Sequence, residues 1–315
     1  MTTNITLNGR ETLREDRLSK LPDEIIHRIF STLDAKDVVQ TSILSKRWRY
    51  IWISVPVLNF YDSSFEHSSL FEHFVHHFLS HRDSSTNVSK LNLECHSEID
   101  DVDLVDSIID CVTDTPSIFT TIEILTIHAE CVVMKLPQLS VCSSLTILKL
   151  CFISTETTTF DFPSLKHLYL CNCRFECGLE NSLDLFQDCV NLEYLHFHNC
   201  HYFGGIDMFK ISSPCLTYLN ISGFRVDEKF DVDCVIELAT PRLKYFKYFD
   251  SDLYYFSSEI NLSFVEKIDI DVGWFIKDTD LLFRLIELFE IMQRAQFISL
   301  STEVIKVSIF SLYQI

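Results

Sequence analysis

Between residues 16 and 52 the apolar residues recur with the spacing of short helices. Pro22 suits the first turn of a helix, where its missing N–H costs nothing, and Asp23 and Glu24 favour the positive end of the helix dipole. We therefore expect a helix from about Pro22, ended by Asp34, which should also cap the next helix. The apolar stripe of this first helix consists of Ile25, Ile26, Ile29, Phe30 and Leu33.

Two further helices are expected before residue 53. The second carries Val38, Val39 and Ile43 towards Leu44, and the third has an apolar face next to a basic one. These two faces consist of Trp48, Ile51 and Trp52, and of Lys46, Arg47 and Arg49. A unit of fewer than about 40 residues rarely buries enough apolar surface to fold alone, so we expect a partner or a neighbouring domain to cover part of it.

After residue 85 a different pattern repeats, Leu-x-x-Leu-x-Leu-x-x-Asn/Cys-x-Leu. This is the template of the leucine-rich repeat, in which each unit adds one strand to a parallel sheet and buries its apolar side against the next unit. The middle apolar positions of the six clear matches are Leu148, Leu168, Leu195, Leu219, Phe246 and Ile268. They lie 20, 27, 24, 27 and 22 residues apart, within the range typical of such repeats.

Weaker copies extend the array on both sides, at Leu91 and Leu93, at Leu125 and Ile127, and at Ile298 and Leu300. Two amphipathic stripes predict helices that cover the convex side or the ends. They consist of Phe71, Phe74, Val75, Phe78 and Leu79, and of Leu281, Leu282, Leu285, Ile286, Phe289 and Met292. The expected fold class is α/β, with a three-helix unit followed by an irregular leucine-rich repeat solenoid of about eight or nine parallel strands forming a concave sheet.

Strand alternation predicts which side chains line the concave sheet, because the repeated leucines point inward and the residues between them point outward. Neighbouring strands should align these outward residues in columns. The columns read Ile147, His167, Tyr194, Tyr218, Tyr245 and Lys267; Lys149, Tyr169, His196, Asn220, Lys247 and Asp269; and Cys151, Cys171, His198, Ser222, Phe249 and Asp271. We expect part of a surface that binds a protein target to be formed by Tyr169, Tyr194, His196, Tyr218 and Tyr245. A solvated sheet with no ligand on this patch is the alternative.

The charge of the chain is distributed unevenly. Residues 1–60 carry nine Lys and Arg against seven Asp and Glu, a net charge of +2, whereas residues 61–315 carry 17 against 38, a net charge of −21. So negative a domain repels phosphate backbones, which disfavours nucleic acid as its partner. No stretch approaches the length of an apolar membrane span, and the 12 cysteines of the 315-residue chain are expected to be reduced thiols.

Two successive repeats contain seven Cys and His residues that could bind a metal ion or form a nucleophile–base pair. They are Cys171, Cys173, Cys177, His196, His198, Cys200 and His201. Alternation splits them, since Cys173 and Cys200 should face inward while Cys171, His196 and His198 face outward, so we expect no zinc site and no cofactor. A nucleophile pair of Cys171 and His198 would lack a recognisable oxyanion hole, so we expect no catalytic residue.

The helical N-terminal segment resembles the F-box. The match consists of Leu21, Pro22, Ile25, Ile29 and Leu33, followed by Ser42, Leu44, Ser45, Arg47, Trp48 and Trp52. The resemblance implies docking onto a Skp-type adaptor, and through it onto a cullin–RING ubiquitin ligase. The residues implied in that docking are Leu21, Pro22, Ile25, Ile29, Leu33, Leu44, Trp48 and Trp52.

With its irregular repeats, the chain as a whole is similar to plant F-box/leucine-rich-repeat proteins of the FBD type, although an FBD domain is not expected before Ile315. The domains expected are a flexible N-terminus (1–15), an F-box (16–60), a linking helix (61–84) and a leucine-rich repeat domain (85–315). The resemblance implies a non-catalytic substrate receptor of a Skp–cullin–F-box ligase that binds an unknown protein target in the cytoplasm or nucleus. A repeat scaffold uncoupled from any ligase is the alternative.

Overall fold

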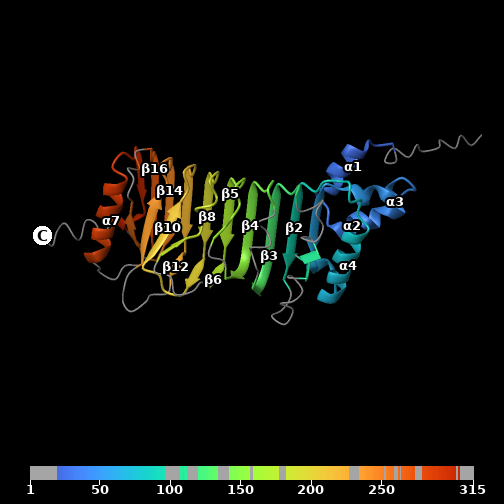
Figure 1. The fold of residues 1–315 in the computed structure, drawn as a ribbon, viewed down its shortest axis with the longest axis horizontal. Coiled ribbons are helices and arrows are strands. Elements are labelled where there is room, and N and C mark those ends of the chain that lie inside the picture. Colours follow the sequence, from blue (N-terminus) through green and yellow to red (C-terminus); the bar gives the residue numbers. More distant parts are fainter. Residues whose placement is uncertain are drawn as a thin grey trace, which may run out of the picture.

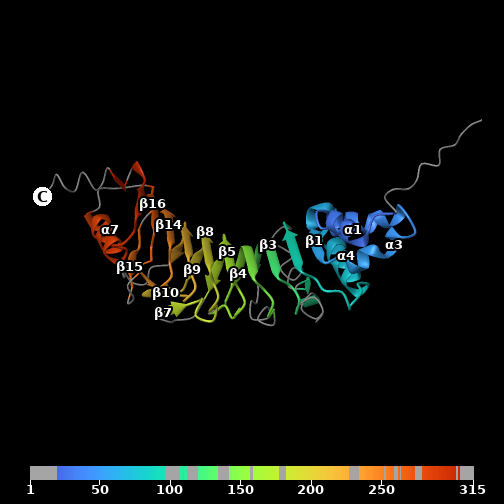
Figure 2. The ribbon, with the colours of Figure 1, turned by 90° about the horizontal axis from the view of Figure 1, so that it is seen from above.

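The structure is a computed structural model that describes residues 20–96, 107–108, 110–111, 120–133, 142–156, 159–176, 182–226, 234–251, 253–258, 262, 264–273, 279–302 and 304–305. The N-terminus expected to be flexible, residues 1–15, lies outside the described residues. The molecule is an elongated, curved solenoid with helices at both ends (Figures 1 and 2). No helix in the described part of the chain has the length and apolar character needed to span a lipid bilayer.

Three short α-helices form the N-terminal end: α1 (Asp23–Phe30), α2 (Ala35–Gln40) and α3 (Trp48–Ile51). 3₁₀ turns follow α2 (Thr41–Ile43) and α3 (Trp52–Ser54). Helix α1 begins one residue after Pro22, which itself has extended backbone. The Asp34 carboxylate accepts a 3.1 Å hydrogen bond from the Lys36 N–H and so caps α2 as predicted.

Two longer helices lie near the two ends of the solenoid (Figure 1). Helix α4 (Ser68–Ser80) follows the N-terminal helices, and α7 (Thr279–Ile291) precedes the last strand. The inward side of α4 buries Phe71, Val75 and Phe78, and that of α7 buries Leu285 and Leu288. Both helices therefore lie where the amphipathic stripes place them. Helix α4 covers the first strand through Phe60, whereas the last strand, β17, leaves Phe297 and Ile298 exposed.

The larger sheet has 13 strands among the described residues, and ten of them form its continuous path. In spatial order these are β1 (Val57–Tyr61), β2 (Lys90–Cys95), β3 (Ile124–Val133), β4 (Ile147–Thr155), β5 (His167–Cys171), β8 (Tyr194–His198), β11 (Tyr218–Ser222), β14 (Tyr245–Asp250), β16 (Lys267–Val272) and β17 (Phe297–Leu300). Every neighbouring pair is parallel. The predicted α/β solenoid is confirmed, and its middle apolar positions, from Leu148 to Ile268, are all buried.

Two features of the architecture differ from the sequence pattern. Strand β1 starts the sheet directly after the N-terminal helices, where no strand was expected. A second, 4-stranded parallel sheet lies on the convex side (Figure 2). Its strands are β15 (Tyr255–Ser257), β13 (Val235–Ala239), β10 (Met208–Ser212) and β7 (Ser182–Asp184). Buried Phe209 and Ile211 alternate with half-buried neighbours, a strand period that a helix cannot satisfy.

A buried asparagine joins the N-terminal helices to the sheet. Asn59 of β1 donates hydrogen bonds of 3.0 and 2.9 Å to the carbonyls of Ser31 and Leu33 at the end of α1. It also accepts a 2.6 Å bond from the Asn92 side chain of β2. Because an unsatisfied buried amide is costly, these bonds fix how the helices meet the first two strands.

The core leucines should dominate the stability of the repeats. Replacing fully buried Leu195 by Ala should lower the free energy of unfolding by about 2–5 kcal/mol, because it removes apolar contacts and leaves a cavity. Urea unfolding followed by circular dichroism measures this loss. Lys247→Ala, at an exposed position of a nearby strand, should change stability by less than about 0.5 kcal/mol. Equal effects of the two changes would contradict the assigned core.

The Asn59 junction gives a second stability prediction. Asn59→Ala leaves the carbonyls of Ser31 and Leu33 without their side-chain donor, so it should cost about 1–3 kcal/mol. The matched control is Asn191→Ala, because Asn191 also donates to a backbone carbonyl, that of Pro163 at 2.7 Å, but at the surface. Urea midpoints should fall clearly more for Asn59→Ala. An equal fall for both variants would argue against a junction role for Asn59.

Candidate functional site

The N-terminal helices expose apolar side chains that the rest of the described chain leaves uncovered. Ile25 and Ile29, four residues apart on α1, are 43% and 40% exposed, and Leu44 is 59% exposed. Pro22, just before α1, is exposed as well. Four of the predicted docking residues therefore lie on an open surface.

The other four predicted docking residues are covered to a greater extent. Trp48 is buried and packs edge-on against Phe30, with ring centroids 5.5 Å apart. Trp52 is half-buried against Phe78 of α4, at 5.1 Å. Leu21 and Leu33 are half-buried against the same core. These four side chains pack in or against the core beneath the exposed residues. In this packing they hold the exposed residues in place and contact a partner little themselves.

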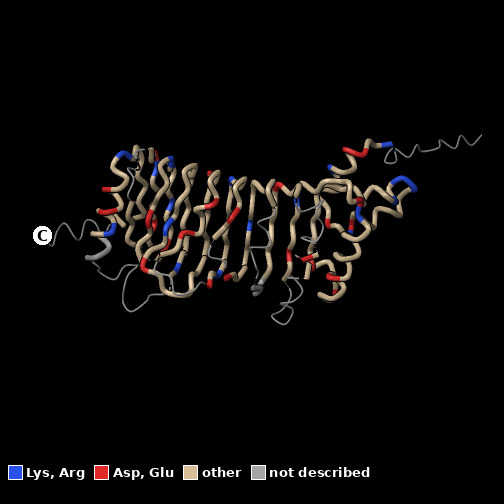
Figure 3. The backbone as a smooth tube through the Cα atoms, viewed as in Figure 1, with Lys and Arg blue, Asp and Glu red and all other residues tan. Residues whose placement is uncertain are grey.

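Two exposed apolar residues of this region are not among the predicted docking residues. Ile43 is 86% exposed in the turn after α2, and Tyr50 is 64% exposed in α3. The sequence pattern includes Ile43 in the apolar face of the second helix, but nothing in that pattern shows that Ile43 would be exposed. We call Ile25, Ile29, Ile43, Leu44 and Tyr50 the apolar docking surface. Exposed Lys46, Arg47 and Arg49 adjoin it at the outer end of these helices (Figure 3).

The concave sheet brings together the predicted columns of side chains. Strand pairing aligns Tyr194 with His167 and Tyr218, Tyr218 with Tyr245, and Tyr169 with His196. All three columns therefore have the predicted order of residues. Equivalent residues of successive strands lie opposite one another because each repeat buries the same leucine positions against its neighbour.

The predicted target-binding residues form a continuous aromatic row. Tyr194 and Tyr218 stack with centroids 4.4 Å apart and an interplanar angle of 7°. Tyr169 lies 5.0 Å from Tyr194 and 6.0 Å from His196, and Tyr245 lies 6.4 Å from Tyr218. Stacked rings hold one another in place, so they offer a rigid contact surface at low entropic cost.

Two residues of the aromatic row, Tyr194 and His196, have pKa values shifted towards their neutral forms. Burial, followed by the proximity of Tyr218 and Tyr169, raises the pKa of Tyr194 to about 12. Burial, followed by the proximity of His198 and Lys247, lowers the pKa of His196. The Asn220 side-chain amide lies 3.0 Å from His196 Nδ1 and can donate to it, which leaves the imidazole proton on Nε2. The row can therefore offer neutral hydrogen-bonding groups and apolar ring faces to a partner.

Two cysteines of the repeat occupy structural positions. Cys173 and Cys200 are buried, and their thiols donate to the carbonyls of Leu150 and Leu170 in the preceding repeats, at 3.4 and 3.3 Å. They face inward as predicted, although the reason is the left-handed backbone of Asn172 and Asn199, which resets the strand alternation just before each cysteine. Each links one repeat to the one before it, as the Asn/Cys position of the template requires.

Cys171 pairs with another cysteine, Cys151, which lies opposite it on β4. The thiol hydrogen bond from Cys151, and then the proximity of Lys149, lower the pKa of Cys171 to about 7 against the opposing effect of burial, while the pKa of Cys151 is raised. His198 is aligned with Cys171 in the register, but its Nδ1 lies 3.4 Å from the Ser222 hydroxyl. The geometry among the described residues thus gives Cys171 a thiol partner and no hydrogen-bonded base.

The candidate metal ligands do not converge in the part of the chain that the structure describes. No group of three or more His, Cys, Asp or Glu side chains there could hold a metal ion. Cys177, one of the candidates, lies outside the described residues.

The Cys151–Cys171 pair predicts selective thiol reactivity. Because the hydrogen bond from Cys151 lowers the pKa of Cys171, Cys171 should react with iodoacetamide several-fold faster at neutral pH than Cys215, a half-buried thiol. Peptide mass spectrometry between about pH 6 and 8 measures the rates. Cys151→Ala removes the stabilising hydrogen bond, so it should raise the pKa of Cys171 and slow its labelling at pH 7. Labelling of Cys171 at the rate of Cys215 in the unaltered protein would contradict the assigned pairing.

Comparison with known proteins agrees with both halves of this architecture. The F-box domain model matches residues 18–60. An FBD-associated F-box protein of Arabidopsis thaliana is 32% identical over 275 residues, which are 85% of this chain and 57% of the relative. The Arabidopsis F-box/LRR-repeat protein 13 is 30% identical, over 75% of this chain and 52% of the relative.

An Arabidopsis F-box/FBD/LRR-repeat protein is likewise 30% identical, over 84% of this chain and 60% of the relative. The chain thus spans little more than half the length of these curated relatives. The chain carries an F-box domain and is a homologue of the Arabidopsis F-box/FBD/LRR-repeat proteins.

Proposed function

We propose that the protein is a non-catalytic substrate receptor of a Skp–cullin–F-box ubiquitin ligase. Its F-box would bind a Skp-type adaptor, and its repeat domain would bind the protein to be ubiquitinated. The observation that carries this proposal is the apolar docking surface of an F-box domain, exposed at the end of the molecule away from the centre of the concave sheet (Figure 1).

The apolar docking surface has the composition of an interface. Isolated apolar residues are normal on a protein surface, but several large ones on one small helical unit favour a binding site. Ile43, Leu44 and Tyr50 are each more than half exposed, so a partner would bury much of their area. The neighbouring basic side chains favour a partner that is acidic around an apolar groove.

The junction between the helices and the sheet supports a tethering role. Asn59 bonds the end of α1 to β1 and β2, and Trp52, Phe78 and Phe60 form a continuous aromatic contact across the junction. A stiff connection keeps a bound target at a defined distance from the adaptor. The resulting rise in effective concentration would accelerate ubiquitin transfer without any catalytic group on this chain.

The concave face supports the target-binding half of the proposal. The Tyr194–Tyr218 stack and its neighbours Tyr169, His196 and Tyr245 present rigid, amphipathic side chains, which are enriched at the centres of protein interfaces. The net negative charge of residues 61–315, −21, favours a target with a basic surface. A repeat scaffold without a ligase remains the second candidate, which adaptor binding distinguishes.

The test is adaptor binding by the full chain. Ile29→Ala combined with Leu44→Ala should weaken binding to a purified Skp-type adaptor at least about tenfold, because truncating a buried interface anchor typically costs more than about 1 kcal/mol. Biolayer interferometry or calorimetry measures the dissociation constants. Leu70→Ala is the matched control, because Leu70 is 50% exposed but lies on α4, and it should leave the affinity unchanged.

These variants change exposed side chains, so their circular dichroism should match that of the unaltered protein. Folded, unaltered protein that fails to bind the adaptor would sink the ligase proposal and leave the repeat scaffold. Unchanged adaptor binding by the Ile29→Ala, Leu44→Ala variant would show that the adaptor binds outside the apolar docking surface.

A further inference from the structure

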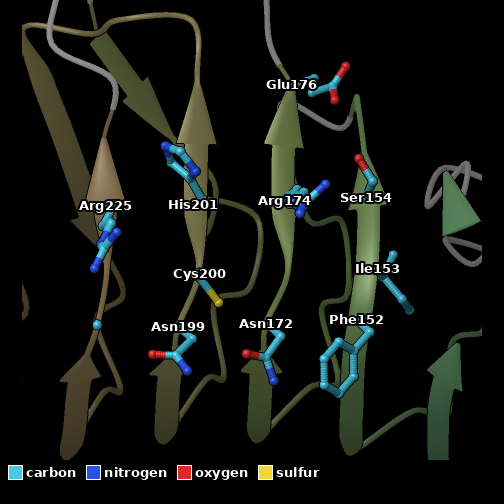
Figure 4. Close-up of a pocket in the computed structure, with 11 residues that line it drawn as sticks. Phe152, Ile153, Ser154, Asn172, Arg174, Glu176, Asn199, Cys200, His201 and Arg225 are labelled. Atoms are coloured by element: carbon cyan, nitrogen blue, oxygen red, sulfur yellow. The ribbon is translucent and has the colours of Figure 1, made fainter. Parts of the chain in front are cut away.

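A polar hollow of about 630 Å³ lies at the carboxyl ends of β4, β5, β8 and β11 (Figure 4). Its walls come from four successive repeats and lie beyond the ends of the concave strands. The residues that line it are Phe152, Ile153, Ser154, Asn172, Arg174, Glu176, Asn199, Cys200, His201, Gly223 and Arg225.

A repeated backbone kink creates this hollow. One residue in each repeat takes the left-handed conformation: Phe152 within β4, with φ of 59°, and Asn172, Asn199 and Gly223 directly after β5, β8 and β11, with φ of 52°, 50° and 64°. Asn and Gly adopt this conformation at the lowest cost. Gly223 is also required by space, because a Cβ there would lie 2.4 Å from Asn199 Oδ1.

After the kinks the chain resumes in three short parallel strands, β6 (Arg174–Glu176), β9 (His201–Phe203) and β12 (Arg225–Val226). Their register places Arg174 opposite His201, and His201 opposite Arg225. The backbones of Arg174 and Arg225 are therefore roughly 10 Å apart, two strand spacings. Guanidinium groups on side chains of that length can both reach a group bound between them.

The two arginines are exposed, and within the described part of the chain neither guanidinium lies at ion-pair distance from a carboxylate. Glu176 is the acidic residue in the lining. Asp250, whose pKa is raised by burial, interacts electrostatically with Arg225. Two arginines against one glutamate give the lining a small excess of positive charge, in a domain whose net charge is −21.

Polar groups that could complement an anion surround the two charges. The backbone N–H groups of Asn172 and Asn199 are already used, since they donate to the carbonyls of His198 and Ser222 at 2.7 Å. Asn172 and Asn199 line one end of the hollow, and Ser154 lies towards the other, near Arg174 and Glu176 (Figure 4). Several donors therefore accompany the two guanidinium groups, an arrangement suited to a ligand with more oxygen atoms than a single carboxylate has.

We propose that this hollow binds a phosphate-type oxyanion, held between Arg174 and Arg225. A phosphate monoester offers three charged oxygen atoms, so each arginine can engage it while the asparagine amides or Ser154 contact the remaining oxygen lone pairs. The monoester can belong to a phosphorylated side chain of a protein or to a free phosphorylated small molecule. The site lies in the repeats, so the test of anion binding does not depend on whether the F-box binds an adaptor.

The test is calorimetry or phosphorus NMR on the full chain at constant ionic strength, with inorganic phosphate and a phosphoserine-containing peptide as probes. Arg174→Gln combined with Arg225→Gln should weaken binding at least about tenfold, because losing a charged hydrogen bond typically costs more than about 1.4 kcal/mol. Arg242→Gln, at an exposed position outside the lining, is the matched control and should preserve binding.

Three results would overturn the site: no binding of either probe, equal binding by the double variant with unchanged circular dichroism, or equal affinity for acetate. Tighter binding of the phosphopeptide than of both inorganic phosphate and its unphosphorylated form would support the site and assign it to a modified protein. Equal affinity for the peptide and inorganic phosphate would support the site and assign it to a free ligand.

Discussion

The parallel register between successive repeats is the constraint on which this structure depends. A single repeat cannot bury its leucines, so Leu168, Leu195 and Leu219 leave water only because neighbouring strands stack in step. Once that register is fixed, every outward position falls into a column. The tyrosine stack, the Cys151–Cys171 pair and the Arg174–His201–Arg225 row are all consequences of it.

The register also shows which parts of the molecule are predictable from sequence. Alternation and the repeat period are local signals, so the buried leucines and the order of the concave columns follow from the sequence alone. Strand β1 alternates too, with Leu58 and Phe60 buried on either side of Asn59, but the apolar residues Val57 and Tyr61 at its outward positions blur the signal. Asn59 is buried because the end of α1 covers it, a tertiary contact that the strand pattern does not reveal. The Arg174–Arg225 hollow does not follow from the sequence either, because it depends on kinks at Asn172, Asn199 and Gly223 that reset the alternation after each strand.

The F-box surface is predictable in part for a similar reason. Helical periodicity identifies Ile25 and Ile29, but it does not distinguish an exposed apolar residue from a buried one, so Trp48 is included although it packs against Phe30. Burial is a tertiary property, set here by α4 and β1 covering one side of the small unit. Ile43 shows the same limit from the other side, because the pattern places it with Val38 and Val39, which pack in or against the core, although it is exposed.

Electrostatics separates the two candidate binding surfaces of the repeats. The field of the acidic domain repels anionic ligands at long range, but it is screened within about 8 Å at physiological ionic strength. An anion that reaches the Arg174–Arg225 hollow then meets two nearby positive charges whose direct interaction outweighs the screened background. Specificity for anions in this protein would therefore come from contact within the hollow, whereas long-range attraction would favour basic partners for the remainder of the sheet. A single target that presents a basic surface with one anionic group would satisfy both.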